Sequence, residues 1–249
     1  METMLLLFGA GLLAGAMNAA AGGGTFVTLP ALVATGVPSV AANVSSTVAL
    51  LPGTLASALA WRSEFRSFEG VSIRLLLAIS LLGGLAGAAL LLLTPNSAFD
   101  GILPWLLLLG TLAFAFGRQA GALLRRHVAL GPGAVVAAQV VLSIYGGYFG
   151  GAVGIMMMAV WSLLSEVDIK AMSAARTLLV SAMNSVAVLC FALFGPVHWP
   201  ATLAVLLGAV IGGYGGALLA RMVPAPVLRG FVILYGAAMT AVFFWRAHG

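Results

Sequence analysis

The sequence contains very few charged residues. Only 7% of its 249 residues are Asp, Glu, Lys or Arg, whereas a soluble domain has about a quarter. This excludes a water-soluble globule, a disordered chain, a coiled coil and a nucleic-acid-binding protein, because each needs more polar residues. Cys190 is the only cysteine, so an intramolecular disulfide is also excluded. With 62% hydrophobic residues, the composition predicts an all-α polytopic membrane protein that forms one transmembrane domain in the lipid bilayer over residues 1–249.

Stretches without Asp, Glu, Lys or Arg locate the membrane crossings. A crossing helix needs about 17–25 apolar residues. Four stretches hold one crossing each, and a fifth holds two crossings on either side of a proline-rich turn. The predicted six simple transmembrane helices therefore lie in Ala42–Trp61, Leu75–Phe99, Gly101–Gly117, Gly230–Trp245, and the two parts of Thr177–Ala220 that Gly195–Pro200 separates.

Two further apolar stretches have an unusual length. Met4–Gly36 and Gly133–Ser165 each contain 33 residues, which as one helix would measure about 50 Å against a hydrocarbon core of about 30 Å. Each is too short for two full crossings and has a glycine cluster near its middle, at Gly22–Gly24 and Gly146–Gly154. We therefore predict two broken-helix hairpins, each made of two half-helices.

Loop charges predict the orientation, because short loops rich in Lys and Arg stay in the cytoplasm. Arginines mark the loops around residues 62–74, 118–126 and 221–229 as cytoplasmic, whereas Thr94–Gly101 and Gly195–Pro200 carry no Lys or Arg. The two hairpins then enter the membrane from opposite sides, and the N- and C-termini lie outside. Glu2 takes the place of a positive leader region, so we expect Met1 to begin the mature chain.

The halves of the chain resemble each other. A shift of 132 residues places Gly15 on Gly147, Gly22 on Gly154, Ser45 on Thr177, Pro52 on Asn184 and Gly83–Gly84 on Gly215–Gly216. Together with the matched element lengths, this predicts an inverted-topology repeat with one half at residues 4–118 and the other at 133–246. Repeats of opposite orientation are typical of secondary transporters.

The helix breaks predict where a substrate binds. Interrupted helices leave backbone N–H groups unpaired, and hydrocarbon cannot pair with them, so breaks line cavities or face protein. The N-terminus of a returning half-helix attracts anions. The substrate-binding candidates at the breaks are Asn18, Gly22, Gly23, Gly24, Gly150, Gly151 and Gly154.

Helix packing is the alternative role for these glycines. It is the favoured reading for the glycine pairs with small-xxx-small spacing, Gly11 with Gly15, Gly83 with Gly87, Gly147 with Gly151 and Gly212 with Gly216. A break is favoured for the triplet Gly22–Gly24.

Four further polar residues are candidates for substrate binding. Arg176 is the only charge near the start of the uncharged helix predicted at Ala174–Phe194, and Asn184 lies on the same face at i+8. Arg176 would supply a fixed positive charge to an anion pocket, or its side chain would extend to the cytoplasmic interface. Ser46 and Thr47 would donate hydrogen bonds to a substrate, or help to cap their helix.

The absence of acidic residues from the predicted crossings limits the kinds of solute and site that the sequence predicts. No Asp or Glu falls inside a predicted crossing, which argues against a carboxylate proton relay or a metal site and favours an anionic or neutral solute. His127, His198 and His248 lie in loops or at the terminus, and the metalloprotease, serine-hydrolase and nucleotide-binding motifs are absent. The sequence predicts neither an enzyme nor a cofactor.

Two glycine-rich motifs resemble the TauE/SafE sulfite exporter family over essentially the whole chain. The first runs from Gly11-x-x-x-Gly15-x-x-Asn18 through Gly22–Gly24 and Pro30 to Ser46-Thr47 and Pro52-Gly53. The second runs from Tyr145 through Gly150-Gly151-x-x-Gly154 to Asp168-x-Lys170, Arg176 and Asn184. The resemblance implies a permease of the bacterial inner membrane for sulfite, sulfonates or related small organosulfur anions.

Two positions differ from the expected pattern. Ile155-Met156 stands in the second motif where the first has Gly23-Gly24, and Arg176 stands where the family often has lysine or asparagine. We expect a secondary transporter that exports a small anion by alternating access. A passive anion channel and a non-transporting membrane scaffold are the alternative functions. The oligomeric state is left open, with a homo-oligomer as one alternative.

Overall fold

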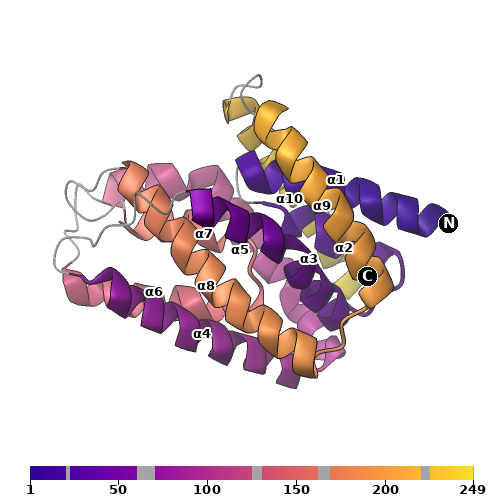
Figure 1. The fold of residues 1–249 in the computed structure, drawn as a ribbon, viewed down its shortest axis with the longest axis horizontal. Helices are drawn as coiled ribbons and strands as arrows, with labels where there is room; N and C mark the ends of the chain where they lie inside the picture. Colours follow the sequence, from indigo (N-terminus) through magenta and orange to yellow (C-terminus); the bar gives the residue numbers. More distant parts are fainter. Residues whose placement is uncertain (21–22, 61–70, 125–130, 162–168, 220–224, 249) are drawn as a thin grey trace.

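The computed structural model describes residues 1–20, 23–60, 71–124, 131–161, 169–219 and 225–248. The described residues form ten α-helices and their connections (Figure 1). In chain order the helices are α1 (Glu2–Ala20), α2 (Thr25–Ala34), α3 (Ser39–Ala60), α4 (Ile73–Leu93), α5 (Asn96–Leu124), α6 (Pro132–Tyr148), α7 (Val153–Trp161), α8 (Ile169–Phe194), α9 (Trp199–Leu219) and α10 (Ala225–His248).

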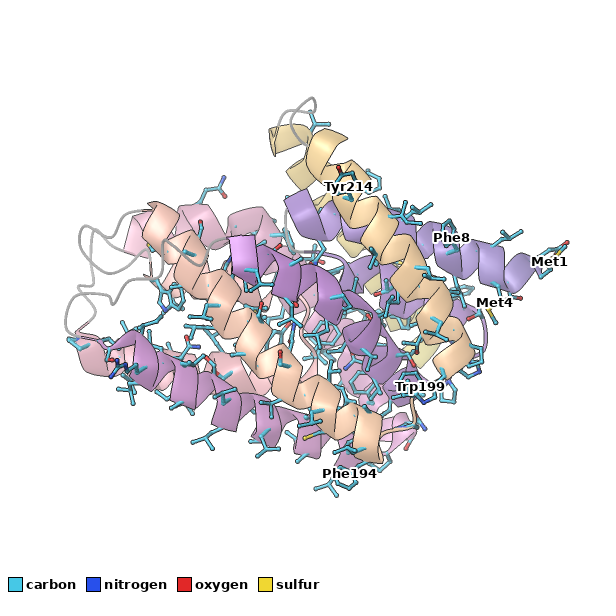
Figure 2. All side chains as sticks on the ribbon, viewed as in Figure 1. Met1, Met4, Phe8, Phe194, Trp199 and Tyr214 are labelled. Carbon is cyan, nitrogen blue, oxygen red and sulfur yellow. The ribbon has the colours of Figure 1, made fainter. Side chains whose placement is uncertain are left out.

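Five helices in the described part are long and apolar enough to cross a membrane, judged by length and composition: α3, α4, α5, α8 and α10. They coincide with five of the six predicted simple crossings. The sixth corresponds to α9, a helix of 21 residues whose stretch Trp199–Tyr214 is apolar. Large apolar side chains point away from the bundle, among them Phe194, Trp199 and Tyr214 (Figure 2). The prediction of an all-α membrane protein is thus confirmed in its general form.

Both 33-residue stretches fold back on themselves. A Cβ built on Gly24 would lie 2.9 Å from the carbonyl oxygen of Ala14, although ten residues of continuous helix would separate these positions by about 15 Å. A Cβ on Gly146 would likewise lie 3.3 Å from Cγ2 of Val153. The chain therefore reverses between α1 and α2 and between α6 and α7.

The arms of these hairpins are unequal, unlike the paired half-helices that we expected. α1 has 19 residues and α6 has 17, whereas α2 has 10 and α7 has 9. The first arms are long because each packs along a full-length neighbour. α2 ends at Ala34. Two residues later the chain turns at Gly36, whose φ of +90° favours glycine, and the backbone N–H of Val37 donates to the carbonyl of Leu32.

Glycines bring the first arms into backbone contact with their neighbours. A Cβ on Gly11 or Gly15 of α1 would overlap the carbonyl of Val205 or Ala209 on α9. A Cβ on Gly87 of α4 would overlap the carbonyl of Ile144 on α6. The residue numbers of the contacting pairs rise together along α1 and α9, so these two helices run parallel. The packing role of Gly11 and Gly15 is confirmed.

The remaining helix contacts place α3 and α8 at the centre of the bundle. α3 packs against α8 and α9, and α8 also packs against α4. α5 packs against α10 and α7. In Figure 1, α3 lies between the pair α4 and α6 on one side and the pair α1 and α9 on the other. The short arms α2 and α7 contact α3 and α8 respectively, so the two chain reversals meet at the α3–α8 pair.

Candidate functional site

A cavity of about 250 Å³ lies between the two hairpins and the α3–α8 pair. Its lining combines the two chain reversals with one face of each central helix. The described residues that line it are Asn18, Thr25, Thr47, Leu50, Thr54, Ser57, Gly150, Val153, Gly154, Ile155, Ser173, Arg176, Thr177, Val180 and Asn184.

Helical periodicity explains which residues of α3 and α8 reach the cavity. On α3 the lining residues recur every three or four positions, beginning at Thr47 and ending at Ser57. On α8 they recur in the same way from Ser173 to Asn184. This spacing is that of one helix face. Each central helix therefore presents a polar stripe to the cavity.

The reversal in the second hairpin holds the start of α7 against the cavity. Gly150 and Ala152 have φ values of +77° and +60°, and the second is uncommon for a residue with a side chain. The Tyr145 hydroxyl donates a 2.9 Å hydrogen bond to the carbonyl of Gly151 across the turn. The turn places Val153 and Gly154, the first two residues of α7, in the cavity wall.

Arg176 lies across this helix start. A Cβ built on Gly154 would be 3.1 Å from Cδ and 3.7 Å from Nε of Arg176, so the absent side chain of Gly154 leaves room for the arginine. Arg176 is the only charged residue among the described residues that line the cavity. No ion pair is found for it in the described part of the chain. A positive side chain and the positive end of a helix dipole therefore share one wall.

Asn184 and several hydroxyl groups provide the neutral polar lining. The side-chain oxygen Oδ1 of Asn184 is buried and has no hydrogen-bond partner among the described residues. Three threonine hydroxyls donate to carbonyls of their own helices, at 2.9 Å for Thr47, 2.8 Å for Thr54 and 2.8 Å for Thr177. Arg176 and Asn184 line the same cavity, as their spacing predicts.

The first hairpin contributes less to the cavity than the sequence suggested. Asn18 and Thr25 line it. Gly23 is enclosed by Met17, Phe114 and Val232, and Gly24 packs against Ala14 and Leu50; neither lines the cavity. Gly22 lies outside the described residues.

Two further candidates stand next to cavity residues but face elsewhere. Ser46 is fully buried and is hydrogen-bonded to Thr28 on α2, whereas its neighbour Thr47 lines the cavity. Gly151 sits over the ring of Phe149, whereas Gly150 and Gly154 line the cavity. The structure thus brings together six of the eleven candidates: Asn18, Thr47, Gly150, Gly154, Arg176 and Asn184.

The cavity is closed toward the N-terminal end of α3. One turn before Thr47, Asn43 is fully buried, and its Nδ2 donates a 2.9 Å hydrogen bond to the carbonyl of Tyr148. On α8, Ala187 and Phe191 follow Asn184 and are also fully buried. At the opposite end of the α3 stripe, Ser57 is exposed. The described part of the cavity wall is therefore less enclosed at the C-terminal end of α3.

Sequence reasoning missed several lining residues with hydroxyl groups. Thr54 and Ser57 continue the α3 face that begins at Thr47, and Ser173 and Thr177 share the α8 face with Arg176. Extending each helix face by three or four residues would have found them. Thr25 directly follows the glycine triplet, and its position at the start of α2 was the available signal.

Comparison with known proteins gives one family for nearly the whole chain. The family model "Sulfite exporter TauE/SafE" matches residues 7–243. The chain is 27% identical over 246 residues to "Probable membrane transporter protein YfcA" of Escherichia coli strain K12, covering 98% of this chain and 90% of that protein. It is also 27% identical over 245 residues to a "Probable membrane transporter protein" of Haemophilus influenzae, covering 96% and 94% of the two chains.

A third similar protein is "Probable membrane transporter protein ORF9" of Sinorhizobium sp, 26% identical over 239 residues that cover 95% of this chain and 90% of that protein. No solved structure matches the chain. The family match and the apolar helices make the chain a multi-pass membrane protein of a transporter family rather than an enzyme family. The chain belongs to the sulfite exporter TauE/SafE family.

Proposed function

We propose that the chain is a secondary transporter that binds a small sulfur oxyanion, sulfite or an organic sulfonate, in the cavity beside Arg176 and exports it by alternating access. The observation that carries this proposal is the position of Arg176 across the start of α7. Arg176 is half-buried and has no acidic partner among the described residues, and such a charge is costly in a membrane protein. An anion in the cavity would offset that cost and would also accept hydrogen bonds from the start of α7.

The arrangement of helices supports alternating access. In each half of the chain a long helix, a short helix and three long helices follow one another. The first helix of each half packs against the fourth helix of the other, as α1 does with α9 and α6 with α4. α3 packs against α8 and α5 against α10, which are equivalent positions. An inverted repeat would produce this pattern, and such repeats can exchange their conformations.

The closed end of the cavity supports a carrier over a passive channel. An open channel needs a continuous path, whereas Asn43, Ala187 and Phe191 are packed on the side of the α3 N-terminus. The C-terminal end of α3 precedes the segment with Arg62 and Arg66, which the loop-charge rule assigns to the cytoplasm. The cavity would then face the cytoplasm, from which an exporter loads its substrate.

Counterflow in proteoliposomes tests this function. Vesicles that contain the purified chain and an excess of unlabelled sulfite are diluted into a trace of labelled sulfite. A carrier accumulates the label transiently, because each outward step with unlabelled substrate allows an inward step with labelled substrate. Labelled sulfite that only equilibrates would indicate a channel, and uptake equal to that of protein-free vesicles would refute sulfite transport.

A further inference from the structure

The described wall of the cavity carries a positive side chain and no negative one. Among the described residues that line it, Arg176 is the only charged residue, and none is Asp, Glu or Lys. The helices α3, α6 and α7 carry no acidic, basic or histidine side chain along their lengths, and α4 carries only Arg74 at its exposed start. Nothing described in the cavity wall offsets the charge of Arg176.

Two helix starts add to this positive charge. Thr25 begins α2 and Val153 begins α7, and both residues line the cavity. The backbone N–H groups of Val153 and Gly154 have no hydrogen-bond acceptor among the described residues. Each helix N-terminus acts as roughly half a positive charge. With Arg176, the cavity therefore presents about two positive charges to a ligand.

The positive groups of the cavity are uncommitted hydrogen-bond donors. The hydroxyls of Thr47, Thr54 and Thr177 donate to carbonyls of their own helices. Arg176 and the N–H groups at the start of α7 have no such partner among the described residues. A ligand in the cavity would therefore meet free donors on the side where the positive charge lies, an arrangement that favours an oxyanion.

From this excess of positive charge we propose that the cavity selects the doubly charged form of a small oxyanion over singly charged anions and zwitterions. This inference rests on the proposed anion transport at the same site, and it narrows the substrates from sulfite and sulfonates in general to those that carry two negative charges. A dianion offsets about two positive charges, whereas a monoanion leaves about one uncompensated in a site of low dielectric. A zwitterion such as taurine brings an ammonium group for which the described cavity wall has no carboxylate.

Competition against sulfite counterflow tests the proposal. Sulfate is doubly charged and methanesulfonate singly charged throughout the neutral pH range, whereas sulfite changes from one to two charges within it. We expect sulfate to compete at least about tenfold better than methanesulfonate, which corresponds to about 1.4 kcal/mol. The apparent affinity for total sulfite should rise with pH in proportion to its dianion, while the affinities for the two reference anions stay constant.

Sulfate and methanesulfonate keep their charge throughout the neutral pH range, so they distinguish a change in the charge of sulfite from a change in the charge of the protein. The titratable groups on the helices packed around Arg176 are the Tyr145 and Tyr148 hydroxyls on α6, Lys170 and Cys190 on α8 itself and Arg74 on α4. If one of these controlled binding, sulfate and methanesulfonate would follow pH as well. That result would overturn the proposal.

Substitution of the arginine provides a second readout. Arg176→Gln removes one positive charge and should lower the ratio of sulfate to methanesulfonate affinity, whereas Arg74→Gln at an exposed position should leave the ratio unchanged. Equal competition by the two anions in vesicles that still show sulfite counterflow would overturn the charge selection and leave anion transport intact. Vesicles without any counterflow would overturn both.

Discussion

Substituting Gly154 by alanine separates the function of the cavity from the stability of the fold. The new Cβ would lie 3.1 Å from Cδ and 3.4 Å from Cγ of Arg176. These distances are shorter than ordinary van der Waals contact, so the arginine side chain must move by a few tenths of an ångström. No backbone atom is among the close neighbours at this position. The arginine can therefore move without separating the helices.

The expected effects on transport and stability have opposite signs. Alanine is favoured over glycine by about 1 kcal/mol in a helix interior and by less at the second residue of a helix, where Gly154 lies. The Gly154→Ala protein should therefore unfold at the same or a slightly higher temperature than the wild type. A misplacement of about 1 Å at a binding group can cost about a hundredfold, and a shift of tenths of an ångström should weaken sulfite transport several-fold. The main effect of Gly154→Ala should be a weaker apparent affinity of the protein for sulfite.

The assay compares initial rates of sulfite counterflow over a range of concentrations with the thermal unfolding midpoint in detergent. Gly230→Ala is the matched control, because a Cβ at Gly230 of α10 would meet nothing within 4 Å. It should leave transport unchanged. If Gly154→Ala transports sulfite with wild-type affinity while Arg176→Gln does not, the contact between α7 and Arg176 has no part in binding, and this reasoning is refuted.

Three further substitutions test the packing and the closed end. Gly15→Leu should prevent recovery of folded, monodisperse protein in size-exclusion chromatography, because even a Cβ there would overlap the Ala209 carbonyl; a wild-type profile would contradict this. Asn43→Leu removes an unpaired Oδ1 but leaves the buried Tyr148 carbonyl without its donor. The orphaned carbonyl should dominate and lower the free energy of unfolding by about 1 kcal/mol, a loss that an unchanged denaturation curve would exclude. Gln139→Leu removes two hydrogen bonds, to Ser80 and Ser143, but it also removes a buried Oε1 that has no partner. Because these two effects oppose each other, the free energy of unfolding should change by less than about 1 kcal/mol. A loss of several kcal/mol would contradict this.

The helix breaks were predictable from length alone. An apolar stretch of 33 residues fits neither one crossing nor two, and glycine clusters marked the reversal points. The length of the arms was not predictable in the same way. α1 continues to Ala20 because it packs against α9 through Gly11 and Gly15. That contact joins residues almost two hundred positions apart in the sequence.

Neighbouring residues show why only part of the site was found. Ser46 and Thr47 are chemically similar and adjacent, yet one is bonded to Thr28 and the other lines the cavity. Successive residues of a helix differ in direction by about 100°. Composition cannot decide which of them faces the cavity, because the packing of α2 and α8 against α3 sets that direction. Arg176 was easier to find, because a lone charge in an apolar helix is conspicuous in any packing arrangement.

Efflux of labelled sulfite from proteoliposomes, with wild-type protein, Arg176→Gln and Arg74→Gln side by side, tests the central claim most directly. Both substitutions remove one arginine charge, but Arg176 lines the cavity and Arg74 lies at the exposed start of α4. We predict saturable efflux for wild type and Arg74→Gln and a loss of at least about tenfold for Arg176→Gln. Equal efflux from all three proteins would contradict the assignment of the anion site to this cavity.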